Sequence, residues 1–340
     1  MYYYTPRLQG RERGLNLHVS PRHLKGHPRY RAHGLRHSAS SFMRFDSGDQ
    51  PLFWSCIDSY WEDFAVLKNT FYQGYSSVLP SLTSRVVEQC VLEQERLCKT
   101  QGEDEQSAWF TAWERYFAKT LGTTDVHRNI LWEGEWSLAA TTRYDTRLRV
   151  WSREALGDYM QALTSPAYHV YNMDLAFPWP TRVSSLEDSA RVKWYRKLQM
   201  QERLPPVLCM WVRPFDAAII IDGHDRMLAA LLNNITPPIV MLEPWTRIRL
   251  ADDVRAAWIE RVEHNYSNMR PHLHRMSEGS IETINRDVMA AYGVTDYAAT
   301  MRVWPYCGGA IRWRVEVGAH MNQLTDEFSQ IARLVQQGFE

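Results

Sequence analysis

The residues best suited to chemistry lie in one short run, Asp222-Gly223-His224-Asp225-Arg226, between an apolar stretch and a helical pattern. Gly223 lets the backbone approach an anion closely, and the N–H groups that begin a helix point at such an anion. Arg226 can offer a bidentate guanidinium to the same anion. Asp222 can hold a metal ion or accept a proton, and His224 can donate to a phosphate oxygen. The run therefore predicts a phosphate site.

We assign the run as follows: Asp222 and His224 are the catalytic candidates, Asp222 is also the metal ligand, and Gly223, Asp225 and Arg226 bind the cofactor. A purely structural interpretation competes with this one. Asp222 and Asp225 can cap the helix, and Arg226 can pair with a carboxylate. A polar run of this length favours the structural interpretation unless the surrounding elements add to it.

The surrounding elements form an ordered pattern. Residues 205–212 (PPVLCMWV), 216–222 (DAAIIID) and 237–244 (PPIVMLEP) predict strands, and residues 226–234 predict a helix between the last two. Residues 186–201 predict a further helix upstream. Because the apolar runs are continuous rather than alternating, we expect these strands to be buried on both faces.

This order of features resembles the ParB/sulfiredoxin superfamily. The resemblance rests on the two Pro-Pro strand starts, the AAIIIDG strand, the DGHDR run and the helix MLAALLNN, and it covers about residues 175–245 of 340. It implies a small mixed core in which Gly223 and Arg226 hold nucleotide phosphates. His224 stands where sulfiredoxins have their catalytic Cys, so peroxiredoxin repair is not expected. Chromosome-partition proteins have Glu-Arg-Arg after the glycine, which argues against their CTP-clamp chemistry here.

The run is most similar to the Asp-Gly-His-Thr-Arg branch of the superfamily, which includes ADP-dependent free serine kinases. There the Asp and His lie beside the transferred phosphate, which implies that role for Asp222 and His224. A second acid upstream serves as general base in those kinases, and the candidates here are Asp174, Glu187 and Asp188. Glu243, after the third predicted strand, could also face the site, but we interpret it as a surface acid.

The resemblance implies a nucleotide-binding protein that takes ATP or ADP, or else CTP, with Mg²⁺, and that transfers or hydrolyses phosphate. Two alternatives stay open. One is a DNA-binding protein or ParB-like nuclease, with Arg302, Arg312 and Arg314 among its phosphate contacts. The other is a non-catalytic interaction protein that keeps the fold, such as a partner or immunity factor in bacterial conflict.

The charge is balanced overall and uneven along the chain. Lys and Arg number 39, and Asp and Glu also number 39. Residues 1–45 hold nine of the cations against one acid, Glu12, so this segment carries +8 and the rest of the chain carries −8. We expect residues 1–48 to form a basic, irregular arm. Such an arm can lie on nucleic acid phosphates or fold back on the acidic body of the same chain.

We expect an α+β protein with that arm, a helical region at 49–170, the ParB/sulfiredoxin-like core at 171–250 and a helical C-terminal region at 251–340. The predicted helices of the second region are 57–71, 84–97 and 105–121, and their Trp and Tyr residues are assigned to the core. The C-terminal region is predicted to have helices at 250–266, 280–293 and 319–339 and a β-hairpin formed by 302–306 and 310–317.

The composition sets the cellular expectations. No apolar stretch approaches the roughly 20 residues of a bilayer-spanning helix, and the start of the chain lacks a secretory signal. The five Cys residues are widely spread with no C-x-x-C pair, which favours a reducing compartment. We therefore expect a soluble, cytoplasmic protein without a membrane partner.

Overall fold

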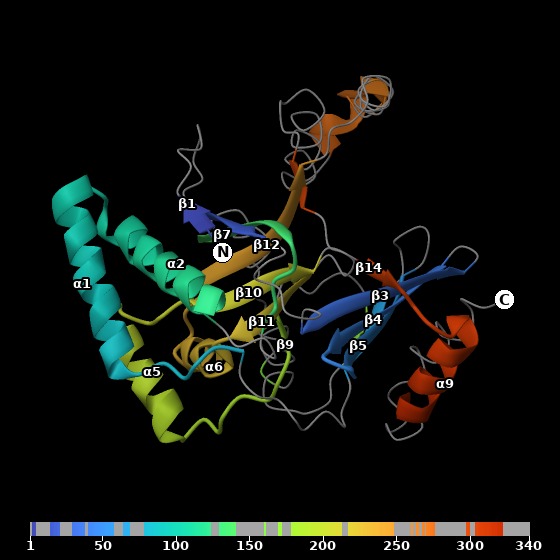
Figure 1. The fold of residues 1–340 in the computed structure, drawn as a ribbon, viewed down its shortest axis with the longest axis horizontal. Helices are drawn as coiled ribbons and strands as arrows, with labels where there is room; N and C mark the ends of the chain where they lie inside the picture. Colours follow the sequence, from blue (N-terminus) through green and yellow to red (C-terminus); the bar gives the residue numbers. More distant parts are fainter. Residues whose placement is uncertain are drawn as a thin grey trace. The chain divides into compact units, whose positions relative to one another are not determined.

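The structure is a computed structural model. It describes residues 2–4, 14–20, 29–37, 40–57, 64–68, 78–123, 129–140, 160, 169–171, 178–212, 217–247, 260, 263–264, 267–268, 270–275, 297–299 and 303–321. These belong to two units, one made of Met1–Pro244 with Met301–Glu340 and the other of Trp245–Thr300. Helices and mixed sheets together make this an α+β protein, as expected (Figure 1).

The larger unit contains a mixed sheet that carries the predicted chemistry. Its order is β1-β2-β7-β12-β10-β11-β9. The strands are β1 (Tyr2–Tyr4), β2 (Leu15–Val19), β7 (Gly134–Ala140), β9 (Trp179–Pro180), β10 (Val207–Val212), β11 (Ala217–Asp222) and β12 (Ile239–Arg247). β10 runs parallel to β12 and antiparallel to β11, so it separates the two strands that helix α6 (His224–Leu232) connects. The three predicted strands and the helix between the last two are confirmed.

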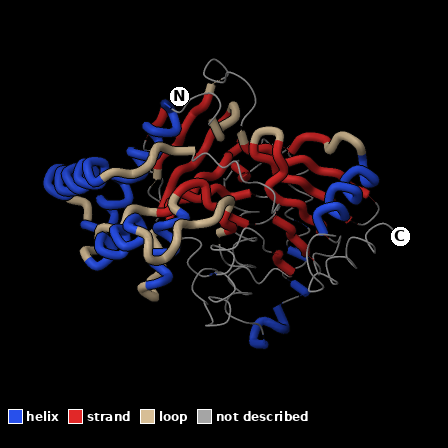
Figure 2. Tube along the Cα trace, turned by 90° about the horizontal axis from the view of Figure 1, so that it is seen from below, coloured by secondary structure: helices blue, strands red, loops and turns tan. Residues whose placement is uncertain are grey.

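A second sheet has the order β14-β3-β4-β5-β6-β8. Its strands are β3 (Tyr30–His37), β4 (Ser40–Ser47), β5 (Gln50–Ile57), β6 (Phe64–Lys68), β8 (His169–Tyr171) and β14 (Val303–Pro305). β3, β4, β5 and β6 pair antiparallel in chain order, and β14 pairs parallel with β3. Figure 2 shows the strands of the larger unit gathered beside its helices.

The predicted irregular arm at 1–48 is wrong, because β2, β3 and β4 lie within it. Apolar side chains alternate along these strands, and Tyr30, Ala32 and Phe45 are fully buried on one face. The intervening cations concealed that alternation. Three of them bind neighbours of the same chain: Arg29 donates to Ser47, Arg31 pairs with Asp49, and Arg44 pairs with Asp46 and Glu316. For these three arginines, the alternative in which the basic segment folds back on the same chain is supported.

The helices of the larger unit are α1 (Ser84–Gln101), α2 (Glu105–Thr123), α5 (Ala190–Met200), α6 and α9 (Gly309–Met321). The predictions for α1, α2 and α5 are confirmed. The predicted helix at 57–71 is wrong, because β6 pairs with β5 there. The second strand of the predicted hairpin is also wrong, because residues 310–317 belong to α9. Alternate apolar residues suggested a strand, yet the two buried ones, Trp313 and Val317, are four apart and share a helical face.

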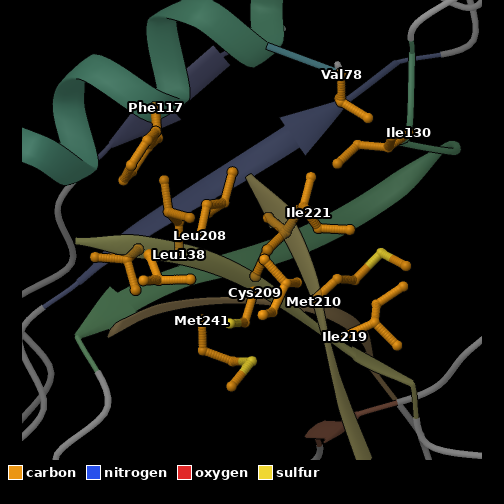
Figure 3. Close-up of a cluster of buried hydrophobic side chains, with 14 of the residues drawn as sticks. Val78, Phe117, Ile130, Leu138, Leu208, Cys209, Met210, Ile219, Ile221 and Met241 are labelled. Atoms are coloured by element: carbon orange, nitrogen blue, oxygen red, sulfur yellow. The ribbon is translucent and has the colours of Figure 1, made fainter. Parts of the chain in front are cut away.

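The main core lies between the first sheet, the helices and one face of the second sheet. Phe117 of α2 reaches toward Leu138 and Leu208 of the first sheet (Figure 3). Phe53 of β5 contacts Trp179 of β9, with ring centroids 5.8 Å apart, which joins the second sheet to this core. Every residue of β10 except Trp211 is buried, as expected for a strand covered on both faces. The Trp residues at 54, 109 and 113 are core residues, as predicted.

The smaller unit contains the end of β12, which pairs antiparallel with β13 (Tyr297–Ala299), and the 3₁₀ helix η4 (Arg270–Arg275). The predicted helix at 280–293 lies outside the described residues, as do most of those at 250–266 and 319–339. In the part of the chain that the structure describes, no helix is both long and apolar enough to cross a bilayer.

Glu114 is a carboxyl buried in this core. It lies on α2 with 3% of its surface exposed, and its Oε1 accepts a hydrogen bond of 2.9 Å from the backbone N–H of Ala140. Burial raises the pKa of Glu114 to about 8, and this single backbone bond opposes that rise only in part. Near neutral pH the side chain is therefore mostly protonated in the folded protein and ionised in the unfolded chain.

This carboxyl predicts a pH-dependent stability. Its folded pKa lies above the unfolded value of 4.5, so its contribution is complete below pH 4.5 and is lost as the pH rises through about 8. We expect the free energy of unfolding to fall by roughly a few kcal/mol over that range, since one pKa unit corresponds to about 1.4 kcal/mol. Urea unfolding at several pH values measures this. Glu114→Gln should flatten the profile, whereas Glu88→Gln, which changes an exposed glutamate of α1, should leave it as in the wild type.

Candidate functional site

The DGHDR run forms the junction between β11 and α6. Asp222 ends the strand, Gly223 is the N-cap residue with φ of 107°, and His224, Asp225 and Arg226 form the first helical turn. A positive φ of this size favours glycine. The sequence brings all five candidate residues together at the start of one helix, as predicted. All five are buried.

The guanidinium of Arg226 folds back over Gly223. Its Nη2 donates to Asp222 Oδ2 at 2.6 Å, and Arg226 is only 1% exposed. A Cβ at position 223 would lie 2.6 Å from Nη2 and 2.7 Å from Nε, so glycine provides the space for this side chain as well as the turn. The carboxylate pairing that the structural interpretation expected for Arg226 is present.

His224 connects the helix to the segment after β9. Its Nε2 lies 3.1 Å from the backbone N of Thr181 and 3.3 Å from that of Arg182, and both N–H groups donate to it. Since Nε2 accepts, the ring is the neutral tautomer with its proton on Nδ1. The Thr181 hydroxyl in turn donates to the Ile220 carbonyl at 2.7 Å. In this geometry His224 joins the start of α6 to residues 181 and 182, and its Nε2 carries no proton to give to a phosphate.

Asp225 also contacts the segment that follows β9. Its Oδ1 accepts a hydrogen bond of 2.7 Å from the backbone N–H of Ser185. Its Oδ2 lies 3.1 Å from Arg191 Nε and 3.7 Å from Arg182 Nη2. Asp225 therefore holds two arginines, Arg182 and Arg191, near the start of α6.

The charges at this junction do not cancel. Three guanidiniums, those of Arg182, Arg191 and Arg226, face the two carboxylates of Asp222 and Asp225, which leaves one positive charge in excess. The side chains of Arg182 and Arg191 are 27% and 39% exposed. Gly223, the N-cap residue of α6, makes no side-chain cap hydrogen bond. The start of α6 also adds the positive end of the helix dipole. The junction is suited to an anion that approaches from the two exposed arginines.

The other predicted acids that the structure describes differ in their exposure. Asp174 is outside the described residues, and Glu187 and Asp188 are exposed in the turn before α5. Glu243 is on β12 and only 8% exposed, so its interpretation as a surface acid is wrong. Across the described ranges, no group of three or more His, Cys, Asp and Glu residues could hold a metal ion. Asp222, held by Arg226, does not fit a protein-bound Mg²⁺ by itself.

Sequence reasoning missed Thr181, Arg182 and Arg191, although they contact the run directly. Ser189, the cap of α5, predicts that helix but says nothing of what the segment before it contacts. Tyr116 of α2 was also missed. Burial raises the pKa of its phenol, and the nearby Asp222 carboxylate raises it further. No local pattern marks these residues, because they reach the site from distant positions in the chain.

Comparison of the chain with protein-family models, with curated proteins and with solved structures found no match.

The Asp222–Arg226 pair predicts a large effect on stability. Asp222→Ala would leave a buried guanidinium without its carboxylate, which typically costs about 3–5 kcal/mol. Urea unfolding of the variant measures the loss. Asp188→Ala is the matched control, since this exposed aspartate should change stability by less than about 0.5 kcal/mol. Equal stability of the two variants would contradict the role given to the pair.

Proposed function

We propose that this protein binds a nucleotide through its phosphates at the junction between β11 and α6. The proposal includes the ParB/sulfiredoxin-like character of residues 175–245, in which Gly223 and Arg226 hold the phosphates. The ligand is ATP or ADP, with CTP as the further candidate, and Mg²⁺ accompanies it as the counterion of its phosphates. The proposal is one of binding first, and phosphoryl transfer or hydrolysis of the bound nucleotide would extend it.

One observation carries the proposal: the Arg226 guanidinium is 1% exposed, and its Nε and Nη1 have no hydrogen-bond acceptor among the described residues. Buried donors usually have a partner, and leaving one unsatisfied costs about 1–3 kcal/mol or more. Asp222 satisfies only Nη2. Phosphate oxygens are suitable acceptors for the remaining donors, because guanidinium groups match their geometry and charge.

The neighbouring groups support an anionic ligand. Arg182 and Arg191 are partly exposed, and both lie within 4 Å of Asp225 next to the first turn of α6. A phosphate that bridged these two arginines would also meet the N–H groups at the start of the helix, which have no acceptor within the helix itself. The excess positive charge and the helix dipole then favour the same ligand charge.

The arrangement supports binding more than catalysis. His224 Nε2 accepts two backbone hydrogen bonds, and Asp222 is engaged by Arg226. Glu187 and Asp188 are exposed in the turn before α5, and no contact links them to the DGHDR run among the described interactions. Nucleotide binding without turnover would agree with the non-catalytic alternative. DNA binding is not favoured, since Arg29, Arg31 and Arg44 of the basic segment bind groups of the same chain.

Calorimetric titration with ATP, ADP and CTP, each with Mg²⁺, tests the proposal. We expect Arg182→Gln and Arg191→Gln each to raise Kd by roughly tenfold, since hydrogen bonds to charged groups contribute about 1.5–3 kcal/mol. Arg226→Ala should abolish binding. Because this third variant also leaves Asp222 buried without its partner, its folding is checked by circular dichroism.

The matched control is Arg196→Gln, which removes an exposed arginine of α5 that bonds Asn233 rather than Asp225. Its Kd should equal that of the wild type. The proposal fails if the wild type binds none of the three nucleotides, or if binding keeps its affinity in the Arg182, Arg191 and Arg226 variants. A phosphate-release assay on the wild type then separates a binding protein from an enzyme.

A further inference from the structure

The second sheet has an ionic cluster that the proposed function does not use. Arg44 and Asp46 of β4 lie directly opposite His33 and Arg31 of β3, on the face turned away from the main core. Asp46 is 1% exposed, and its Oδ2 lies 2.8 Å from Arg44 Nη2 and 3.3 Å from His33 Nε2. A carboxylate this deeply buried is stable in its ionised form only while cations compensate it.

Arg44 extends from this cluster to α9. Its Nη1 donates to both carboxylate oxygens of Glu316, at 3.2 and 3.1 Å, and its guanidinium lies over the Tyr306 ring, 5.1 Å from the centroid. One guanidinium therefore binds Asp46 within the sheet and Glu316 on the helix. Trp54 of β5 and Arg312 of α9 also donate to Glu316. Of these contacts, those of Arg44 and Trp54 with Glu316 join α9 to the sheet.

Two further contacts fix the same segment. Trp313 packs against Phe42, with ring centroids 4.9 Å apart, and its indole N–H donates to the Met43 carbonyl at 3.0 Å. β14 pairs with β3 so that Trp304 lies opposite His33. Figure 1 shows β14 and α9 beside β3 and β4. β14 is thus an edge strand of the second sheet, and α9 packs against that sheet through Trp313 and Glu316.

We infer that His33 is a pH-sensitive switch. Proton uptake by its imidazole weakens the ion pair between Arg44 and Glu316, and this loosens residues 303–321 from the second sheet. An imidazolium at His33 would stand directly opposite Arg44 across the strand pair, and like charges in that position repel. Arg31, two residues away on the same strand face and paired with Asp49, adds a further cation.

The surroundings of His33 determine whether the packing of residues 303–321 strengthens or weakens as the pH falls. Burial lowers the pKa of His33 from its ordinary value of 6.5; Asp46 and the Pro305 carbonyl oppose this, and Arg44 and Arg31 lower it further. His33 is then neutral in the packed state at pH values where the released imidazole would be protonated. Packing is complete above pH 6.5 and weakens as the pH falls below it. Burial raises the pKa of Asp46, so proton uptake by this carboxyl favours the packed state as the pH falls, which opposes the effect of His33.

The inference is tested by amide hydrogen exchange of the full-length protein between pH 7.5 and 5.5. The exchange rates are corrected for the intrinsic rate at each pH. We expect the protection of residues 303–321 to fall by several fold and at most about tenfold over this range, while that of α1 stays constant. His33→Gln should make the protection independent of pH. Glu316→Gln should lower it already at pH 7.5.

The matched control is His18→Gln on β2, where the imidazole is 52% exposed and 3.9 Å from Glu135. It should keep the wild-type profile. A flat profile in the wild type overturns the inference whatever the variants do. A pH-dependent loss that persists in His33→Gln also overturns it, because another group would then be the titrating one.

Discussion

The burial of β10 on both faces is the constraint on which the larger unit depends. Its residues are apolar without alternation, so water must be excluded from both sides of the strand. Phe117 and Trp113 of α2 belong to the core around this strand, and so do Phe53 of the second sheet and Trp179 of β9. The two sheets of the larger unit therefore share one hydrophobic core. The strands of the basic segment at the start of the chain contribute buried apolar residues to it.

The same burial shapes the candidate site. α6 starts where β11 ends, next to β10, and its first turn is as buried as the strands. Polar side chains in such a place need partners, which is why Asp222 binds Arg226 and His224 accepts from the segment after β9. The result is a positively charged junction with buried guanidinium donors. Its exposed part consists of Arg182 and Arg191, which come from outside the DGHDR run.

The two ionic clusters of the molecule have different partners. At the start of α6, three guanidiniums face two carboxylates, and the excess charge is positive. On the second sheet, Arg44 pairs with both Asp46 and Glu316, and the imidazole of His33 lies beside Asp46. The first cluster has an excess positive charge that can attract an anionic ligand. In the second, Arg31, Arg44 and Arg312 face Asp46, Asp49 and Glu316, so the charges balance while His33 is neutral. A change in protonation there acts on the chain's own packing.

The sequence by itself determined the elements whose patterns are local: the strands and helix around DGHDR, and the helices α1, α2 and α5. It also placed the five candidate residues together, because they are adjacent in the chain. Tertiary structure alone decided the rest. Residues 30–37, 40–47 and 50–57 form strands whose apolar residues are buried in the core, and 310–317 form a helix on which Trp313 and Val317 share a buried face. Arg182 and Arg191 join the site through contacts distant in the chain, and long-range packing of this kind leaves no periodic pattern in a single sequence.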